Sequence, residues 1–202
     1  NGTASFSELG KQLYLGTLFL DTPNQSANDI LNSSQKKRME LRFTGSMSKR
    51  RWGQTWTQSI AINSPRETMV SAADDLSATL SAFQGNLEYG DKVIIDYDPL
   101  YGTNVSVNGV TLVKDKSSAL FTLFLSSWIG PVPPSSQFKG AILGQADSKN
   151  DYTSFLALTP PPTRVSAVKE WGTALKAEEE LAAAEALAEE EAKKPKKKRS
   201  RK

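Results

Sequence analysis

The sequence has 202 residues, of which 38% are hydrophobic, so it can form one domain with a buried core and a tail. It contains no Cys and no His, which excludes a disulfide framework, a thiol nucleophile, a Ser-His-Asp triad and His-ligated zinc. It also has no run of about 18 apolar residues, so we expect no membrane-spanning helix.

The formal net charge of +3 conceals a strong segregation of charge along the chain. Residues 1–163 carry 14 basic and 14 acidic side chains, and residues 164–192 carry three basic and eight acidic ones. Residues 193–202 carry eight basic side chains and no acidic one. The pI near 9.0 therefore reflects the last ten residues and not the rest of the chain.

The beginning of the chain is predicted to form strands. One segment is apolar at nearly every position after Gly10, which is typical of a strand buried on both faces. A later segment places Met39, Leu41 and Phe43 at alternate positions, which predicts a strand with one buried face. The expected elements are strands over residues 3–9, 11–20 and 36–44, with one helical turn over residues 26–33.

The hydrophobic period becomes helical over residues 47–60. Trp52 and Trp56 lie four apart on one face of this predicted helix, and burial in the core is the simplest interpretation of both. The sequence Ser-Pro-Arg-Glu that begins at Ser64 has the pattern of a capping box, with Ser as N-cap. We expect it to open a second helix that ends at Gly85.

The chain is organised around residues 90–130. Asn108-Gly109 lies between two alternating runs and predicts a hairpin, because both residues tolerate the positive φ of a type I′ turn. We therefore expect a three-stranded meander. Residues 119–129 are too widely apolar for a surface helix, so we expect a helix buried on the sheet, ended by Gly130 in the αL conformation.

The end of the chain has three parts of different composition. Residues 145–163 look irregular and end in a Thr-Pro-Pro-Pro boundary that no regular element can cross. Residues 164–192 are rich in Ala and Glu and predict a long helix, which has no sustained heptad and is expected to be a solvated spacer. Residues 193–202 should be disordered because like charges repel. The folded domain is thus expected over residues 1–144.

The order of elements over residues 1–144 resembles the chalcone isomerase-like family of bacterial exported proteins. The resemblance rests on the Asn-Gly hairpin, a helix ending Ser-x-Trp-Ile-Gly-Pro, and a short helix closing on Ala-Ile-Leu-Gly. It implies an α+β fold in which an antiparallel sheet has helices packed on one face, with an apolar cleft between them. It also implies a periplasmic or secreted protein whose signal peptide is removed.

The plant enzymes that name the family surround their ligand with an Arg, a Tyr and an Asn. In this sequence the Tyr position falls on Ser48, the Asn position on Thr55, and the Arg position within residues 3–7, where nothing is basic. Isomerisation needs an electrophile to stabilise developing enolate and phenolate charge, and these side chains do not supply one. The resemblance therefore implies a binding protein more than an enzyme.

No cofactor and no metal are expected from the sequence. The Gly-rich phosphate-binding patterns Gly-x-x-x-x-Gly-Lys-Ser/Thr and Gly-x-Gly-x-x-Gly are both absent. Asp91, Asp96, Asp98 and Asp115 flank predicted turns and strand ends, where carboxylates commonly cap turns or promote solubility.

The expected function is binding of a small apolar ligand, such as a fatty acid or another lipid-like molecule, in the cleft between sheet and helices. The family members that bind fatty acids also use an Arg for the carboxylate, so its absence leaves that ligand open. The alternatives are that the aromatic side chains fill the core and leave no cavity, that the protein is an adaptor acting through its C-terminal helix and tail, or that it is an isomerase with reassigned residues. Binding sites for small apolar ligands are mostly apolar with few polar groups, and in this sequence the expected polar groups are Ser48 and Thr55. The candidate ligand-binding residues are Tyr14, Leu18, Ser48, Trp52, Thr55, Trp56, Phe121 and Phe124.

The basic tail is a candidate segment for binding a polyanion such as an anionic membrane surface. Near such a membrane each Lys or Arg contributes about 1 kcal/mol, screened over about a Debye length, so several together bind reversibly. Alternatively, residues 178–191 fold back and neutralise the tail, or the tail only aids solubility. Its basic residues are Lys193, Lys194, Lys196, Lys197, Lys198, Arg199, Arg201 and Lys202.

Overall fold

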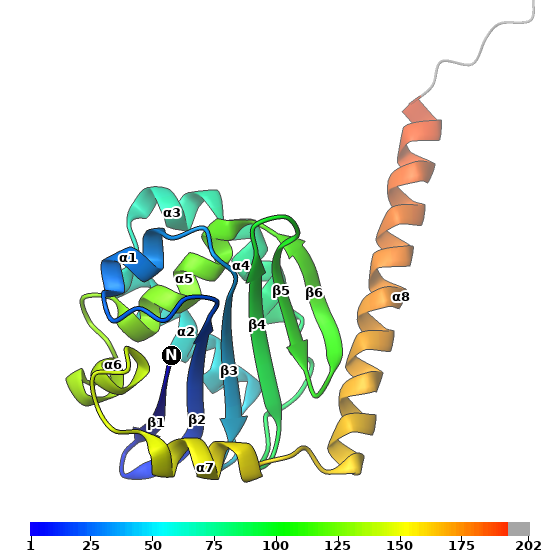
Figure 1. Cartoon of the computed structure of the whole chain (residues 1–202). Helices are drawn as coiled ribbons and strands as arrows, with labels where there is room; N and C mark the ends of the chain where they lie inside the picture. Colours follow the sequence, from blue (N-terminus) through cyan, green and yellow to red (C-terminus); the bar gives the residue numbers. More distant parts are fainter. Residues whose placement is uncertain (194–202) are drawn as a thin grey trace, which may run out of the picture.

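The computed structural model describes residues 1–193, and its centre is one six-stranded sheet (Figure 1). The strands lie in sequence order and each is antiparallel to its neighbours. The predicted α+β class and antiparallel sheet are therefore confirmed. The strands are β1 (Gly2–Glu8), β2 (Lys11–Leu20), β3 (Lys37–Phe43), β4 (Lys92–Asp98), β5 (Gly102–Val107) and β6 (Val110–Lys116).

Two tight turns connect neighbouring strands through residues with positive φ. Asn108 and Gly109 have φ values of 51° and 82° between β5 and β6, as a type I′ hairpin requires. The predicted meander is thus confirmed. Leu9 and Gly10 have φ values of 51° and 74° between β1 and β2, where the bulky Leu9 is an uncommon residue for this conformation.

One face of the sheet carries the main core and most of the helices. Tyr14, Leu18, Met39 and Leu41 point to this inner face, because alternate residues of neighbouring strands share a face. The most deeply buried helix, α5, packs there against α2 and α6. The helices are α1 (Ala27–Asn32), α2 (Lys49–Asn63), α3 (Arg66–Ser71), α4 (Ala73–Ser81), α5 (Ser118–Ile129), α6 (Ser136–Ile142), α7 (Lys149–Ala157) and α8 (Pro162–Lys193).

The predicted capping box is wrong. Ser64 ends α2 instead, since its backbone N–H donates to the Ile60 carbonyl at 3.0 Å, and α3 begins after Pro65 without a side-chain cap. The single helix expected after Ser64 is also broken at Ala72, which has φ −117° and ψ 13°. The Ser64 hydroxyl is buried and makes no hydrogen bond with the N–H groups that begin α3.

Gly130 ends the buried helix, but the predicted αL conformation is wrong. Its φ is −70°, which any residue can adopt. A side chain is excluded for a different reason: a Cβ would collide with the Ser126 carbonyl oxygen and lie 2.6 Å from Asn63 Oδ1. Close approach of α2 and α5 therefore requires Gly here.

The segment over residues 145–163, expected to be irregular, contains α7 on the outer face of the sheet. Phe155 and Leu158 pack there on Leu15 of β2 in a second, smaller core. Arg42 of β3 stacks on the Phe155 ring at 4.2 Å. Its Nη1 donates to the carbonyls of Phe155, Leu156 and Leu158 at the end of α7, at 2.8, 3.2 and 3.0 Å. Helices therefore lie on both faces, and not on one alone.

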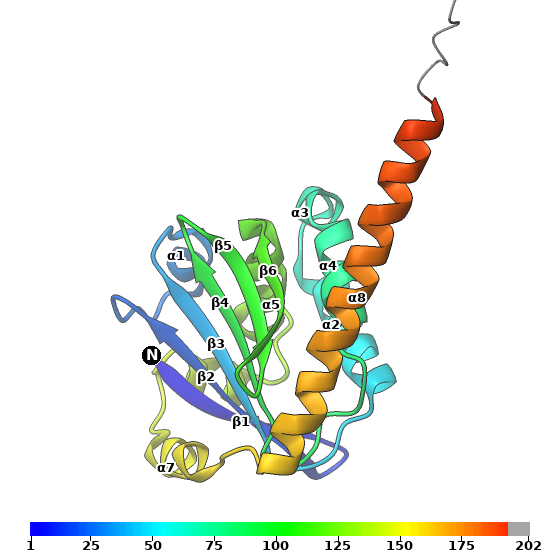
Figure 2. The ribbon, with the colours of Figure 1, turned by 90° about the vertical axis from the view of Figure 1, so that its right-hand side faces the viewer.

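The long helix α8 begins as part of the domain and ends as a projection from it (Figure 2). Val168 and Trp171 are buried in the main core beside β6, and Gly172 is needed there because a Cβ would lie 2.8 Å from Val110. The solvated spacer expected from the sequence is therefore wrong for these first turns. No helix in the described part of the chain is long and apolar enough to cross a bilayer. Of the tail predicted over residues 193–202, Lys193 is the last residue of α8, and residues 194–202 lie outside the described residues.

Candidate functional site

A pocket of about 250 Å³ lies on the inner side of the sheet, and we call it the aromatic pocket. Its walls come from β1, β2, α2 and α5, and from residues 132–134 at the rim. Aromatic side chains supply most of the depth, which is typical of sites for small apolar molecules. The lining residues used in the following argument are Phe6, Tyr14, Trp52, Thr55, Trp56 and Trp128.

Helix geometry forms the first wall of the aromatic pocket. Trp52, Thr55 and Trp56 are three and four residues apart, so they share one face of α2. The Trp52 and Trp56 rings meet edge to face with centroids 5.4 Å apart, and Trp56 meets Phe124 of α5 at 4.8 Å. These contacts hold the indole rings in fixed orientations.

The opposite wall is a stack of rings on the first two strands. Phe6 of β1 stacks on Tyr14 of β2 at 4.7 Å with an interplanar angle of 12°, and Tyr14 stacks on Trp128 of α5 at 6.4 Å. Gly16 makes room for this arrangement, because a Cβ would lie 2.7 Å from Trp128 Cη2. The sequence therefore uses one Gly on β2 to seat an indole ring against the sheet.

Two polar atoms of the pocket residues are buried without a partner. The Nε1 atoms of Trp52 and Trp128 make no hydrogen bond within the described residues. Burial raises the pKa of the Tyr14 hydroxyl, so Tyr14 stays protonated. The indole of Trp128 beside it lowers this pKa in part, although the Trp128 N–H does not meet the geometry of a hydrogen bond to the Tyr14 oxygen. An unsatisfied buried donor costs about 1–3 kcal/mol, so an acceptor from a ligand would be favourable here.

The rim of the aromatic pocket is apolar and held in place. Ile62 and Val132 flank the opening with 62% and 53% of their surfaces exposed. Asn63 fixes this rim: its Oδ1 accepts from the Val132 N–H at 2.7 Å and its Nδ2 donates to the Val132 carbonyl at 2.8 Å. Glu8, also at the opening, is paired with Arg51 at 2.7 Å.

The structure brings together only half of the residues proposed from the sequence. Tyr14, Trp52, Thr55 and Trp56 line the aromatic pocket. Ser48 instead caps α2, accepting from the Arg51 N–H at 3.2 Å. Three further candidates, Leu18, Phe121 and Phe124, do not line the pocket, because their side chains are enclosed by the packed core.

Trp128 is the residue that sequence reasoning missed. It belongs to the apolar run of α5, where nothing separates a pocket wall from a core position. Gly16, at a central position of an otherwise bulky strand, is the one signal that could have indicated it.

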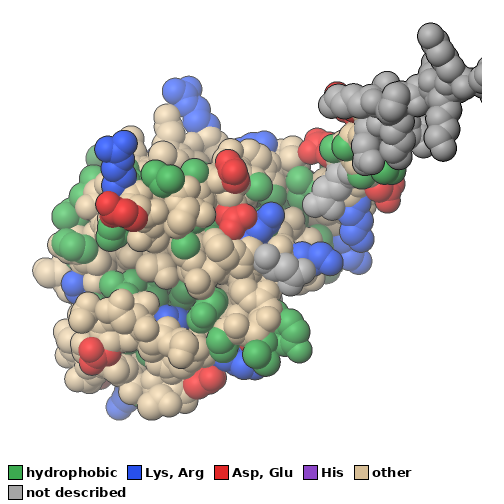
Figure 3. All heavy atoms as spheres, turned by 90° about the horizontal axis from the view of Figure 1, so that it is seen from above, with side chains coloured by type: hydrophobic (Ala, Val, Ile, Leu, Met, Phe, Trp, Pro, Cys, Tyr) green, Lys and Arg blue, Asp and Glu red, His purple; other side chains and the backbone are tan. Residues whose placement is uncertain are grey.

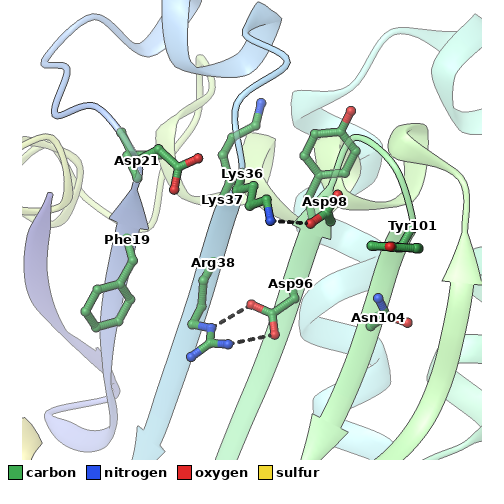
Figure 4. Close-up of a pocket in the computed structure, with 11 residues that line it drawn as sticks. Phe19, Asp21, Lys36, Lys37, Arg38, Asp96, Asp98, Tyr101 and Asn104 are labelled. Carbon is green, nitrogen blue, oxygen red and sulfur yellow. Dashed lines mark hydrogen bonds and ion pairs between the residues drawn. The ribbon is translucent and has the colours of Figure 1, made fainter.

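A second depression of about 530 Å³ lies at the end of the two central strands, where β3 begins and β4 ends (Figure 4). Arg38 forms two hydrogen bonds with Asp96 across these strands, at 2.6 and 3.0 Å, and Lys36 pairs with Asp98 at 2.8 Å. It is larger than the aromatic pocket, and Lys36 and Arg38 in it are already neutralised by carboxylates of the same sheet.

Lys37 lies beside this depression but points into the protein. It is almost fully buried, and its Nζ donates to the carbonyls of Ile30 and Ser33 at 2.8 and 2.6 Å. Burial lowers the pKa of Lys37 to about 8. The contacts hold the end of α1 against the start of β3, so a structural role explains this lysine.

Comparison with known proteins identifies the fold. A family model described as chalcone isomerase-like matches residues 1–144. The chain belongs to the chalcone isomerase-like family. A solved structure of a fatty-acid binding protein from Arabidopsis thaliana is similar, with 17% identity and a TM-score of 0.56 over 73% of this chain and 87% of that one. No protein with a curated description matches the sequence.

Membership in the chalcone isomerase-like family sharpens the interpretation of the aromatic pocket. From the sequence we expected Ser48 and Thr55 at the positions of the family's Tyr and Asn; in the structure Ser48 caps α2 and Thr55 lines the pocket. Among the described residues that line the pocket, none is basic. Apart from Glu8, the polar groups of this lining are neutral and stand in an apolar enclosure.

Proposed function

We propose that this domain binds a small apolar molecule with one hydrogen-bond acceptor, such as a fatty acid, in the aromatic pocket without transforming it. The observation that carries the proposal is the pair of unpartnered indole N–H groups of Trp52 and Trp128 in an aromatic enclosure. An acceptor on the ligand would satisfy donors that otherwise destabilise the fold. The similar Arabidopsis protein, described as binding fatty acids, supports this choice of ligand class.

The size of the pocket limits how the ligand would sit. Small-molecule sites usually measure about 300–1,000 Å³, and the aromatic pocket is slightly smaller at about 250 Å³. We infer that one end of the molecule enters the pocket. The remainder would lie over Ile62 and Val132, whose exposed apolar surfaces continue the lining outward.

A pair of substitutions on α2 tests the proposal. Thr55→Leu places extra volume in the aromatic pocket and removes a hydroxyl, so we expect dodecanoate affinity, measured by isothermal titration calorimetry, to fall by about tenfold or more. The control, Thr57→Leu, changes an exposed residue on another face of the same helix and should leave the affinity unchanged.

Two results would contradict the proposal. One is that the wild-type protein binds no dodecanoate, and the other is that both variants bind it equally well. Turnover of a chalcone above background by the wild-type protein would favour the isomerase hypothesis instead.

A further inference from the structure

A groove of about 910 Å³ runs between α8 and the edge strand β6, away from the aromatic pocket. Its floor is apolar, with Leu112 and Leu175 among the lining side chains. Lysines line both sides: Lys114 and Lys116 on β6, and Lys169 and Lys176 on α8. In the view from above, basic side chains lie along the side of the domain where α8 leaves it (Figure 3).

The distal part of α8 has the opposite character. Beyond residue 176 the helix projects from the domain, and Leu181 and Leu187 are 62% and 64% exposed. Residues 177–192 contain seven Glu and no basic residue. Most helices gain their stability from packing, so an acidic helix that projects from the domain with exposed leucines is a candidate for contact with another molecule.

The two parts of α8 share one face. Lys169, Thr173 and Lys176 line the groove and are spaced four and three residues apart. The same spacing continues through Glu180, Ala183 and Leu187. This face of α8 is therefore basic near the domain, carries Glu180 just beyond it, and ends in the apolar Ala183 and Leu187, so it is not the apolar heptad of a coiled coil.

We propose that two copies of this chain associate through α8, with the distal helix of each copy lying antiparallel in the lysine-lined groove of the other. A two-fold axis near residue 178 places Lys176 of each copy opposite Glu180 of the other, and Lys169 opposite Leu187. Leu187 of each copy then reaches the apolar groove of the other. The occupant is a second copy because this sequence carries both the basic groove and the acidic helix that complements it.

The association is expected to be weak and salt-dependent. Exposed ion pairs contribute little each and are screened by salt, so the contact depends on several pairs acting together. Sedimentation velocity of the full chain should show a dimer that forms with increasing concentration at low salt and dissociates at high salt.

Charge reversal tests the interface directly. The variant Lys176→Glu should weaken the dimer by about tenfold, because the Lys176–Glu180 pair occurs twice across the two-fold axis and carboxylates would then face carboxylates. Adding Glu180→Lys to it should restore the dimer. Lys11→Glu, which makes the same charge change at an exposed site outside the groove, should have no effect beyond that of net charge.

Each contrary outcome overturns the proposal. A chain that is monomeric at every concentration does not use α8 for self-association. A dimer that survives Lys176→Glu uses another contact, such as the basic residues 193–202 on the acidic helix. A failure of the variant that combines Lys176→Glu with Glu180→Lys to recover would exclude the antiparallel register.

Discussion

Asp91→Ala is expected to lower the free energy of unfolding by about 3–5 kcal/mol, because it removes the fully buried carboxylate of an ion pair and leaves several donors without their acceptor. Asp91 is fully buried, and its carboxylate accepts from Arg164 Nη2 at 2.7 Å and from Arg164 Nε at 3.2 Å. It also accepts from the Glu88 N–H and from Asn108 Nδ2, each at 2.8 Å. One side chain therefore ties a turn, the Asn-Gly hairpin and α8 together.

The matched control is Asp96→Ala in β4, the strand that begins directly after Asp91. Asp96 also pairs with an Arg through two hydrogen bonds, but both partners are substantially exposed, so we expect a loss of less than about 1 kcal/mol. Urea denaturation at neutral pH measures both. Equal losses for the two variants would mean that the buried network does not hold α8 and the hairpin to the domain.

Lys37 is expected to make the protein more stable as the pH rises from about 8 to 10.5. Burial lowers its folded-state pKa to about 8, so the unfolded chain binds more protons than the folded one in this window. The full difference from the ordinary value near 10.5 corresponds to about 3 kcal/mol, at about 1.4 kcal/mol for each pH unit. The two carbonyls that accept from the ammonium group offset part of this gain.

The comparison with Lys37→Met isolates this effect from that of other titrating groups. One of these is Tyr14, whose raised pKa lowers the stability only as the pH rises above the ordinary Tyr value of 10.0. We expect the free energy of unfolding of the wild type, relative to Lys37→Met, to rise by about 2–3 kcal/mol from pH 7 to pH 10.5. Chemical denaturation across this range measures it. Parallel pH curves for the two proteins would show that the Lys37 ammonium is not held in a desolvated site.

Local patterns were sufficient to predict most of the sheet and the buried helix. The Asn108-Gly109 turn, the alternation in β3 and the broad apolar face of α5 depend on neighbours within a few residues. The placement of α7 and α8 depends on distant partners instead. Arg42 binds the end of α7 113 residues away, and Arg164 pairs with Asp91 across 73 residues, so no spacing in the sequence could indicate either contact.

Four of the eight proposed site residues line the pocket, because local patterns indicate which side chains turn inward but not what surrounds them. Aromatic residues on apolar faces indicated Tyr14, Trp52 and Trp56, because periodicity shows which side of an element turns inward. Periodicity does not show whether the space beyond is filled. Phe121 and Phe124 occupy closed core while Trp128, a few residues later on the same helix, lines the pocket.

The most direct test of the aromatic pocket as a ligand site is an NMR titration of ¹⁵N-labelled protein with dodecanoate, observed at the indole N–H signals of its four Trp residues. The proposed function predicts that the signals of Trp52 and Trp128 shift downfield and saturate together as their Nε1 atoms acquire an acceptor. The signal of Trp171, which is buried near the start of α8 and lies outside the pocket, should not shift and serves as an internal control. Unmoved signals of Trp52 and Trp128, or an equal shift of Trp171, would contradict binding in the aromatic pocket.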